Sequence, residues 1–148
     1  MRTRDDSNIE CVFIRVPTEM QIEQITDLYR AQGWWEKGEE GREGQLIARL
    51  IDGSHCFAIA TDGRSILGMG RAISDGVSDA YIQDLTVRQD VRNTGIGRRI
   101  LQALLRRLHE DGIPWIGLIA EPGSFNLYYK AGFREMRNST PMLLSKEL

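Results

Sequence analysis

The chain has little of what marks secreted, metal-binding or membrane-spanning proteins. Cys11 and Cys56 are its only cysteines, too few for a disulfide framework and without the spacing of a metal motif. No apolar run approaches the length of a membrane span, and the first ten residues lack the apolar stretch of a signal peptide. We therefore expect free thiols, no metal, no membrane contact and a reducing compartment, by default the cytoplasm.

An excess of basic residues is also missing. The formal net charge is −2, which argues against nucleic acid as a partner. Residues 88–111 nevertheless hold six arginines against three acids, a local net charge of +3. A basic patch in an acidic protein favours a small anionic ligand over a polymer. A DNA-binding helix built on these arginines is the weakest hypothesis, because they are interspersed with apolar residues.

The composition, with 41% hydrophobic and 27% charged residues among 148, fits one globular domain spanning residues 1–148. Apolar periodicity and turn signals predict an α+β fold in the order β-α-α-β-β-β-α-β-α-β-β. The expected strands are 11–16, 55–61, 65–74, 80–87, 114–121 (buried), 133–136 and 141–145. The expected helices are 18–31, 44–52, a long one with its apolar face from Ile96 to Leu108, and 124–131. Residues 33–44 should form a loop.

Two glycines stand at the start of the long helix. Backbone N–H groups at a helix start lack partners and favour an anion, and Gly95 and Gly97 let the backbone approach phosphate oxygens closely. Arg92 and Arg98 add charged donors. The segment has neither the Lys-Ser/Thr ending of a nucleotide P-loop nor a third glycine of a dinucleotide fingerprint. It predicts a pyrophosphate site, with a purely structural turn as the alternative.

Two motifs resemble those of one enzyme family. The segment "VRQDVRNTGIGRR" resembles the acetyl-coenzyme A signature of the GNAT acyltransferases, with Arg92, Gly95 and Gly97 at the signature positions. The segment "LYYKAGF", residues 127–133, is similar to the end of the last conserved helix in that family. The element order also matches, so the resemblance implies a GNAT-like fold: a mixed, mostly antiparallel central sheet flanked by helices.

The resemblance implies a binding site for acetyl-coenzyme A. The pantetheine arm would lie along the preceding strand like an added strand, and the turn at the helix start would hold the pyrophosphate. Arg98 or Arg99 would approach the adenosine 3′-phosphate, and Ser124 or Asn126 would contact coenzyme A elsewhere. The cofactor-binding residues expected in this way are Leu85, Thr86, Val87, Arg92, Asn93, Thr94, Gly95, Ile96, Gly97, Arg98, Ser124 and Asn126.

Acetyl transfer to an amine needs a neutral amine, a polarised thioester and a proton for the departing thiolate. Tyr128 matches the tyrosine of the family and is the expected acid, although a tyrosine there can also simply pack. Asp84 is the candidate base, being the carboxylate inside "AYIQDLTV"; the alternative is a structural role at a strand bulge. Tyr81 stands where histone-modifying members have glutamate, which argues against their mechanism.

The acceptor side is indicated less directly. In the family the first two helices and their loop cover the acceptor, so Trp34, Trp35 and Glu36 could bind a cationic amine; a tryptophan pair can equally anchor the loop on the core. Arg71 is a further candidate. The expected activity is transfer of acetyl to a primary amine of a small molecule or peptide by direct attack in a ternary complex. A non-catalytic acyl-coenzyme A sensor is the alternative, and a homodimer is a family-level expectation.

Overall fold

The computed structural model of the protein describes residues 8–35 and 43–145. Contacts divide the chain into two compact units, Met1–Leu118 and Ile119–Leu148. The first unit holds β1 (Glu10–Phe13), α1 (Glu19–Ala31), α2 (Glu43–Gly53), β2 (Cys56–Thr61), β3 (Ile66–Ser74), β4 (Asp79–Val87), the 3-10 turn η2 (Gln89–Val91), α3 (Ile96–Glu110) and β5 (Trp115–Leu118). The second holds α4 (Phe125–Lys130).

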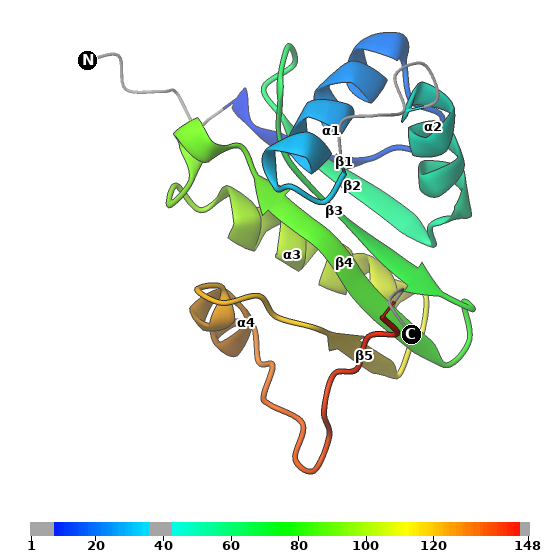
Figure 1. Ribbon diagram of the computed structural model, residues 1–148, viewed down its shortest axis with the longest axis vertical. Helices are drawn as coiled ribbons and strands as arrows, with labels where there is room; N and C mark the ends of the chain where they lie inside the picture. The colour runs from blue at the N-terminus through cyan, green and yellow to red at the C-terminus, as the bar shows by residue number, and fades with distance from the viewer. Residues whose placement is uncertain (1–7, 36–42, 146–148) are drawn as a thin grey trace. The chain divides into compact units, whose positions relative to one another are not determined.

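The sheet of the first unit has its strands in chain order, β1-β2-β3-β4-β5 (Figure 1). Neighbouring strands are antiparallel except for β4 and β5, which are parallel because α3 crosses back between them. The predicted α+β class and mostly antiparallel mixed sheet are therefore confirmed. Of the expected loop 33–44, residues 36–42, including Glu36, lie outside the described residues, and residues 43–44 already belong to α2.

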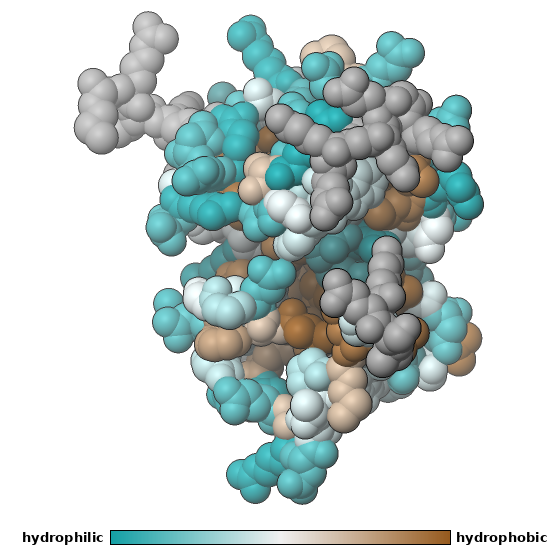
Figure 2. All heavy atoms as spheres, in the orientation of Figure 1, coloured by the Kyte–Doolittle hydropathy of each residue, from teal (hydrophilic) through white to brown (hydrophobic). Residues whose placement is uncertain are grey.

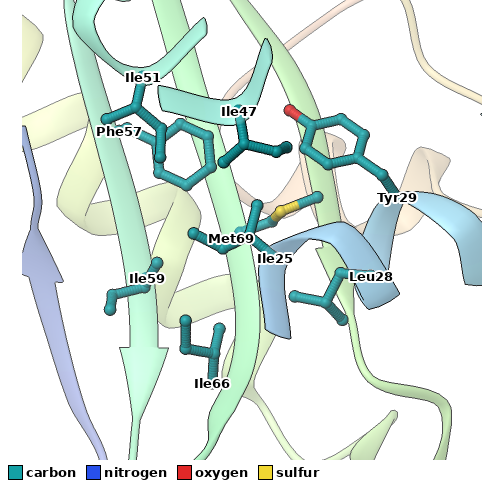
Figure 3. Close-up of a cluster of buried hydrophobic side chains, with 9 residues drawn as sticks. All are labelled: Ile25, Leu28, Tyr29, Ile47, Ile51, Phe57, Ile59, Ile66 and Met69. Atoms are coloured by element: carbon teal, nitrogen blue, oxygen red, sulfur yellow. The ribbon is translucent and has the colours of Figure 1, made fainter. Parts of the chain in front are cut away.

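Helices α1 and α2 cover one face of the sheet. Thr18 caps α1 and forms a capping box with Gln21, as the threonine before the apolar periodicity predicts. The inward side of both helices meets the sheet in one buried cluster (Figure 3), whereas hydrophilic side chains dominate the outer surface around α1 (Figure 2). The cluster contains Ile25, Leu28, Tyr29, Ile47, Ile51, Phe57, Ile59, Ile66 and Met69.

Helix α3 covers the other face and lies unusually close to β3. A Cβ on Gly70 would stand 3.0–3.1 Å from Leu85, Ile100 and Leu104, and one on Gly68 would stand 2.8 Å from Ile100. These two glycines give α3 the room to pack its fully buried residues against the strands. Those residues include Ile100, Leu101, Leu104 and Leu108, which confirms the predicted apolar face.

Strand β5 is shorter and more exposed than predicted. It runs over Trp115–Leu118 rather than 114–121, and Trp115 keeps 37% of its surface exposed. Its indole ring lies over Gly117, where a Cβ would be 2.5 Å away, and meets the Tyr81 ring at 5.1 Å between centroids. Trp115 therefore lies on a partly exposed face of the sheet instead of filling the core.

The second unit corrects two predictions. Helix α4 and its end at Gly132 (φ +102°) are as expected. No strand forms at 133–136 or 141–145, so the prediction of two closing strands is wrong. Neither segment pairs with a strand in the part of the chain that the structure describes, and Pro141 has no N–H to donate to a ladder. Met142, Leu143 and Leu144 are each more than 80% exposed.

Candidate active site

The site is built on a break in β4. Pairing of β4 with β5 stops at Ile82 and Leu118. The register between β3 and β4 shifts just after that point, because Arg71 faces Gln83 whereas Met69 faces Thr86. One extra residue on β4 makes Asp84 and Leu85 a bulge opposite Gly70, where Asp84 has φ +57°, a left-handed conformation that aspartate tolerates better than most residues.

Beyond the bulge, one edge of β4 is open. The Arg88 N–H donates to the Leu67 carbonyl of β3 at 2.8 Å. Because backbone groups alternate in direction along a strand, the N–H and carbonyl of Thr86 also face β3, and those of Leu85 and Val87 point to the opposite, outer edge. Within residues 8–35 and 43–145, no strand pairs with that outer edge. An extended ligand can therefore add there as a strand would. The resemblance described above predicts Leu85, Thr86 and Val87 in this role.

The open edge leads directly into the glycine turn. Arg92 is exposed, and its Nε donates to the Val87 carbonyl at 3.1 Å, so its guanidinium lies where the edge ends. Asn93 has φ +62°, and the exposed Thr94 donates its hydroxyl to the Val91 carbonyl. The turn is thus held by its own hydrogen bonds.

Helix α3 starts with free backbone donors. Gly95 is its N-cap residue at φ +88°, with no side-chain hydrogen bond from the cap to the helix end and open space where a Cβ would stand. The Arg99 N–H donates to the Gly95 carbonyl, so the N–H groups of Ile96, Gly97 and Arg98 lie before that first helical bond. The arrangement can hold an anion.

The arginines of the expected phosphate site do not all have the same surroundings. Arg98 is exposed on the first turn of α3. Arg99, the other candidate for the 3′-phosphate, donates instead to the Ile9 carbonyl beside β1. Arg88 is engaged by the Asp90 carboxylate at 2.6 Å, which raises the pKa of its guanidinium.

On the α1 and α2 face, Asp84 is held by two donors. Its Oδ2 accepts from the Tyr29 hydroxyl at 2.7 Å and from Arg71 Nε at 2.6 Å. Arg71 also donates to Ser54 Oγ and Gln83 Oε1, both at 3.3 Å. Burial and the Asp84 charge raise the pKa of Tyr29 well above its usual range, so its hydroxyl remains a donor. Asp84 thus lies at a strand bulge, as the structural alternative to a catalytic base predicts.

The two tryptophans belong to the same cluster. The Trp35 ring stacks on Tyr29 at 4.9 Å between centroids, and the Trp34 ring meets Tyr29 edge-on at 6.0 Å. Both are partly buried against the core. The structure thus brings Trp34, Trp35, Asp84 and Arg71 around Tyr29. Sequence reasoning missed Tyr29 as a site residue because it falls on the apolar stripe of α1; its polar end within that stripe was the available signal.

The second unit carries Tyr128. Its ring packs edge-on against Phe133 at 5.9 Å, and burial together with the Glu121 charge raises the pKa of its hydroxyl. Ser124 donates to the Glu121 carbonyl at 2.6 Å, and Asn126 is exposed on α4. Neither a group of three possible metal ligands nor a helix able to cross a membrane occurs in the part of the chain that the structure describes.

Comparison with known proteins gives the class. A family model described as "Acetyltransferase (GNAT) domain" matches residues 39–142. An uncharacterized N-acetyltransferase ycf52 of Pyropia yezoensis is 34% identical over 137 residues, covering 89% of this chain and 75% of the relative. The fold and sequence thus define an acetyltransferase. The chain belongs to the GNAT family.

Two further comparisons bear on function and fold. Serotonin N-acetyltransferase 2, chloroplastic, of Oryza sativa subsp. japonica is 26% identical over 119 residues, covering 80% of this chain and 59% of the relative. The crystal structure of a probable acetyltransferase from meticillin-resistant Staphylococcus aureus superposes with a TM-score of 0.76 at 20% identity, covering 93% of this chain and 98% of that one. The latter confirms the fold.

Proposed function

We propose that the 148 residues act as one acyltransferase domain that moves the acetyl group of acetyl-coenzyme A to a primary amine, by direct attack in a ternary complex. The observation that carries this proposal is the continuity of two features. The open outer edge of β4 at Leu85–Val87 runs, through the Arg92 bond to the Val87 carbonyl, into the uncapped start of α3 at Gly95. A ligand with an extended amide arm and a pyrophosphate matches that sequence of donors.

Each part of the donor has its own group of residues. The backbone groups of Leu85 and Val87 face the pantetheine amides, with Thr86 between them facing β3. The turn from Arg92 through Asn93, Thr94, Gly95, Ile96 and Gly97 surrounds the pyrophosphate, and Arg98 supplies charge for the 3′-phosphate. Ser124 and Asn126 are further coenzyme A contacts in this proposal.

The chemistry follows from the same assignment. The neutral amine attacks the thioester carbon, a C–N bond forms, and an outward backbone N–H of β4 stabilises the oxyanion. The C–S bond then breaks, Tyr128 gives its proton to the thiolate, and the extra amine proton leaves through water. The Tyr128 hydroxyl carries its proton at neutral pH, as an ordinary tyrosine does, and burial raises its pKa further, so the proton is available to the thiolate. We assign Asp84 to positioning rather than to base catalysis, since its Oδ2 already accepts two hydrogen bonds.

The acceptor is proposed to be a small-molecule or peptide amine that approaches from the side of Trp34, Trp35 and Arg71. Their contacts with the Tyr29–Asp84 pair next to the β4 bulge support this side. The rice relative named for serotonin makes an aromatic monoamine the first acceptor to test. Two free thiols, Cys11 and Cys56, support a reducing compartment such as the cytoplasm.

Ligand-dependent stability tests the donor site first. Acetyl-coenzyme A at a hundred times its Kd should stabilise the protein by about 2.7 kcal/mol, whereas dephospho-coenzyme A and ATP should do less. Arg92→Ala should weaken the effect, and Arg106→Ala, which removes an exposed arginine further along α3, should not. Thiol release with an amine panel then separates an enzyme from a binding module. Absence of stabilisation at millimolar acetyl-coenzyme A would refute the donor site.

A further inference from the structure

Two hydrogen bonds join the end of α1, at Tyr29 and the C-cap residue Gln32, to β4 at its bulge and just after it. The Tyr29 hydroxyl donates to Asp84 Oδ2 at 2.7 Å, and Gln32 Nε2 donates to Thr86 Oγ1 at 2.6 Å. Tyr29 and Gln32 are three residues apart and therefore share one side of the helix. Asp84 and Thr86 are two apart and lie on either side of Leu85. We call this pair of bonds the α1 clamp.

The bulge needs such support because its backbone is strained. A non-glycine residue in the left-handed region, such as Asp84 at φ +57°, persists where the surrounding structure over-determines it. Asp84 and Leu85 share the place opposite Gly70 of β3, so neither has a residue of its own to pair with in the register. Side chains add further hydrogen bonds: Arg71 from β3 and Tyr29 from α1 bind the Asp84 carboxylate, and Gln32 binds Thr86, the next residue whose backbone faces β3.

The direction of the outer edge depends on this bulge. Side chains and backbone groups alternate along a strand, so a shift of one residue would turn the Leu85 and Val87 N–H groups away from the open edge and toward β3. Tyr29 is well placed to prevent that shift. Its hydroxyl is a permanent donor because burial and the Asp84 charge raise its pKa, and the side chain is 2% exposed.

We propose that Tyr29 is a positioning residue for the acyl donor: through Asp84, and with Gln32 through Thr86, it holds the bulge so that the Leu85 and Val87 backbone groups face the open edge of β4. What that edge binds rests on the proposed function. Tyr29 itself makes no contact with the donor in this assignment. Its ring contacts Trp34 and Trp35 instead, so a single side chain meets both the tryptophans of the proposed acceptor side and the donor strand.

Removing only the hydroxyl tests the proposal. Tyr29→Phe keeps the ring packed against Trp35 but loses the bond to Asp84. The matched control is Tyr129→Phe, which also removes a tyrosine-to-carboxylate bond of 2.7 Å, to Glu135, on an exposed side chain of the second unit. We expect the KM for acetyl-coenzyme A to rise roughly tenfold in Tyr29→Phe, the size of a lost hydrogen bond to a charged group. The KM for the amine should stay within about twofold, and Tyr129→Phe should resemble the wild type.

A series at Asp84 separates positioning from general destabilisation. Asparagine keeps a side-chain acceptor and tolerates positive φ, whereas alanine has neither property. Asp84→Asn should therefore retain tighter acetyl-coenzyme A binding than Asp84→Ala, measured well below both melting temperatures. Equal affinities for the two variants, or a Tyr29→Phe variant that melts lower but binds acetyl-coenzyme A as tightly as the wild type, would overturn the proposal.

Amide hydrogen exchange without any ligand keeps this inference separate from the proposed function. In Tyr29→Phe and in Gln32→Leu, the Thr86 amide should exchange about tenfold faster, beyond any change in the most protected amides of α3. If acetyl-coenzyme A fails to bind the wild type, the donor assignment is lost, but faster Thr86 exchange still supports the clamp. If Thr86 exchange is unchanged in both variants, the clamp does not hold the bulge, whatever the ligand.

Discussion

Gly68 of β3 lies directly against the Thr86 carbonyl of β4: a Cβ at Gly68 would stand 2.9 Å from that oxygen. The same Cβ would stand 2.8 Å from the Ile100 side chain of α3. Backbone fixed in a ladder cannot yield as a side chain can. The position of β4 at Thr86 therefore depends on the absence of a side chain at Gly68.

Gly68→Ala should consequently destabilise the protein by about 1–3 kcal/mol, as overpacking of a dense core does. It should also weaken acetyl-coenzyme A binding, because it displaces β4 at Thr86. Gly70→Ala should cost less, since its contacts at 3.0–3.1 Å are all side-chain methyl groups. Urea unfolding and calorimetric titration measure both effects. Gly53→Ala is the control, because nothing lies within 4 Å of its Cβ; a Gly68→Ala as stable as this control would contradict the account.

Loss of Arg71 should leave the Asp84 carboxylate with one donor instead of two. Both side chains are mostly shielded, with 15% and 21% of their surfaces exposed. Arg71→Met should lower the free energy of unfolding by about 1–3 kcal/mol, the cost of an under-satisfied polar group. Adding Asp84→Asn should recover part of that loss. Chemical denaturation of the two variants, with Arg106→Met as an exposed control, checks the expectation; a double variant no more stable than Arg71→Met would argue against it.

Asp111 gives the first unit a contact whose strength depends on pH. Its Oδ2 lies 2.7 Å from His55 Nε2 and 2.9 Å from Arg107 Nε, and the His55 bond, followed by Arg107, lowers the pKa of the carboxyl. A carboxyl whose pKa is lower folded than unfolded stabilises the protein above the unfolded pKa, and that stability is lost as the pH falls through the folded pKa.

Asp111→Asn should therefore lower stability at pH 7 by up to about 1 kcal/mol, the range of partly exposed pairs. The difference from the wild type should shrink as the pH drops below about 4, the unfolded value for aspartate. Thermal melts between pH 3 and 7 measure it. Glu110→Gln removes the same charge one residue away and should show no such trend. A gap between Asp111→Asn and wild type that stays constant down to pH 3 would exclude the linkage.

Tyr128→Phe tests the proton donor of the proposed reaction. With the hydroxyl gone, kcat should fall by about a hundredfold, the usual contribution of an acid, while both KM values change little. Because burial and the Glu121 charge raise the pKa of Tyr128, the wild type should keep its kcat at alkaline pH beyond the point where an ordinary tyrosine loses its proton. Stopped assays of thiol release across pH measure this limb. Equal kcat values for Tyr128→Phe and Tyr129→Phe would remove Tyr128 from the mechanism.

Local sequence chemistry predicted the elements whose signals are contained in a few residues. Thr18 before an apolar stripe predicted the start of α1. Asp62-Gly63 predicted the turn between β2 and β3, where the Asp62 carboxylate accepts from the Arg64 and Ser65 N–H groups. The segment at 141–145 failed for the complementary reason. Its apolar residues are typical of a strand, but a strand forms only where a neighbouring strand supplies hydrogen bonds. A local sequence pattern does not show whether such a neighbour is present.

The site was predictable in part for the same reason. Arg92, Gly95 and Gly97 lie within six residues and carry a recognisable turn. The Tyr29–Asp84 bond joins residues 55 positions apart through a bulge that no glycine marks. Tyr29 looked like one more core aromatic, and its role became visible only when the register of β3 and β4 was known.

The strand β4 and the start of the α3 crossover form one continuous part of the chain. In the proposed function, every residue that holds the donor in the first unit falls in one continuous stretch, 85–98, whereas Trp34 and Trp35 of the acceptor side precede β2 and Arg71 belongs to β3. Substitutions at these acceptor positions would then leave the donor stretch itself unchanged. The α1 clamp limits such substitutions, since Tyr29 and Gln32 join the end of α1, next to the two tryptophans, to the donor strand.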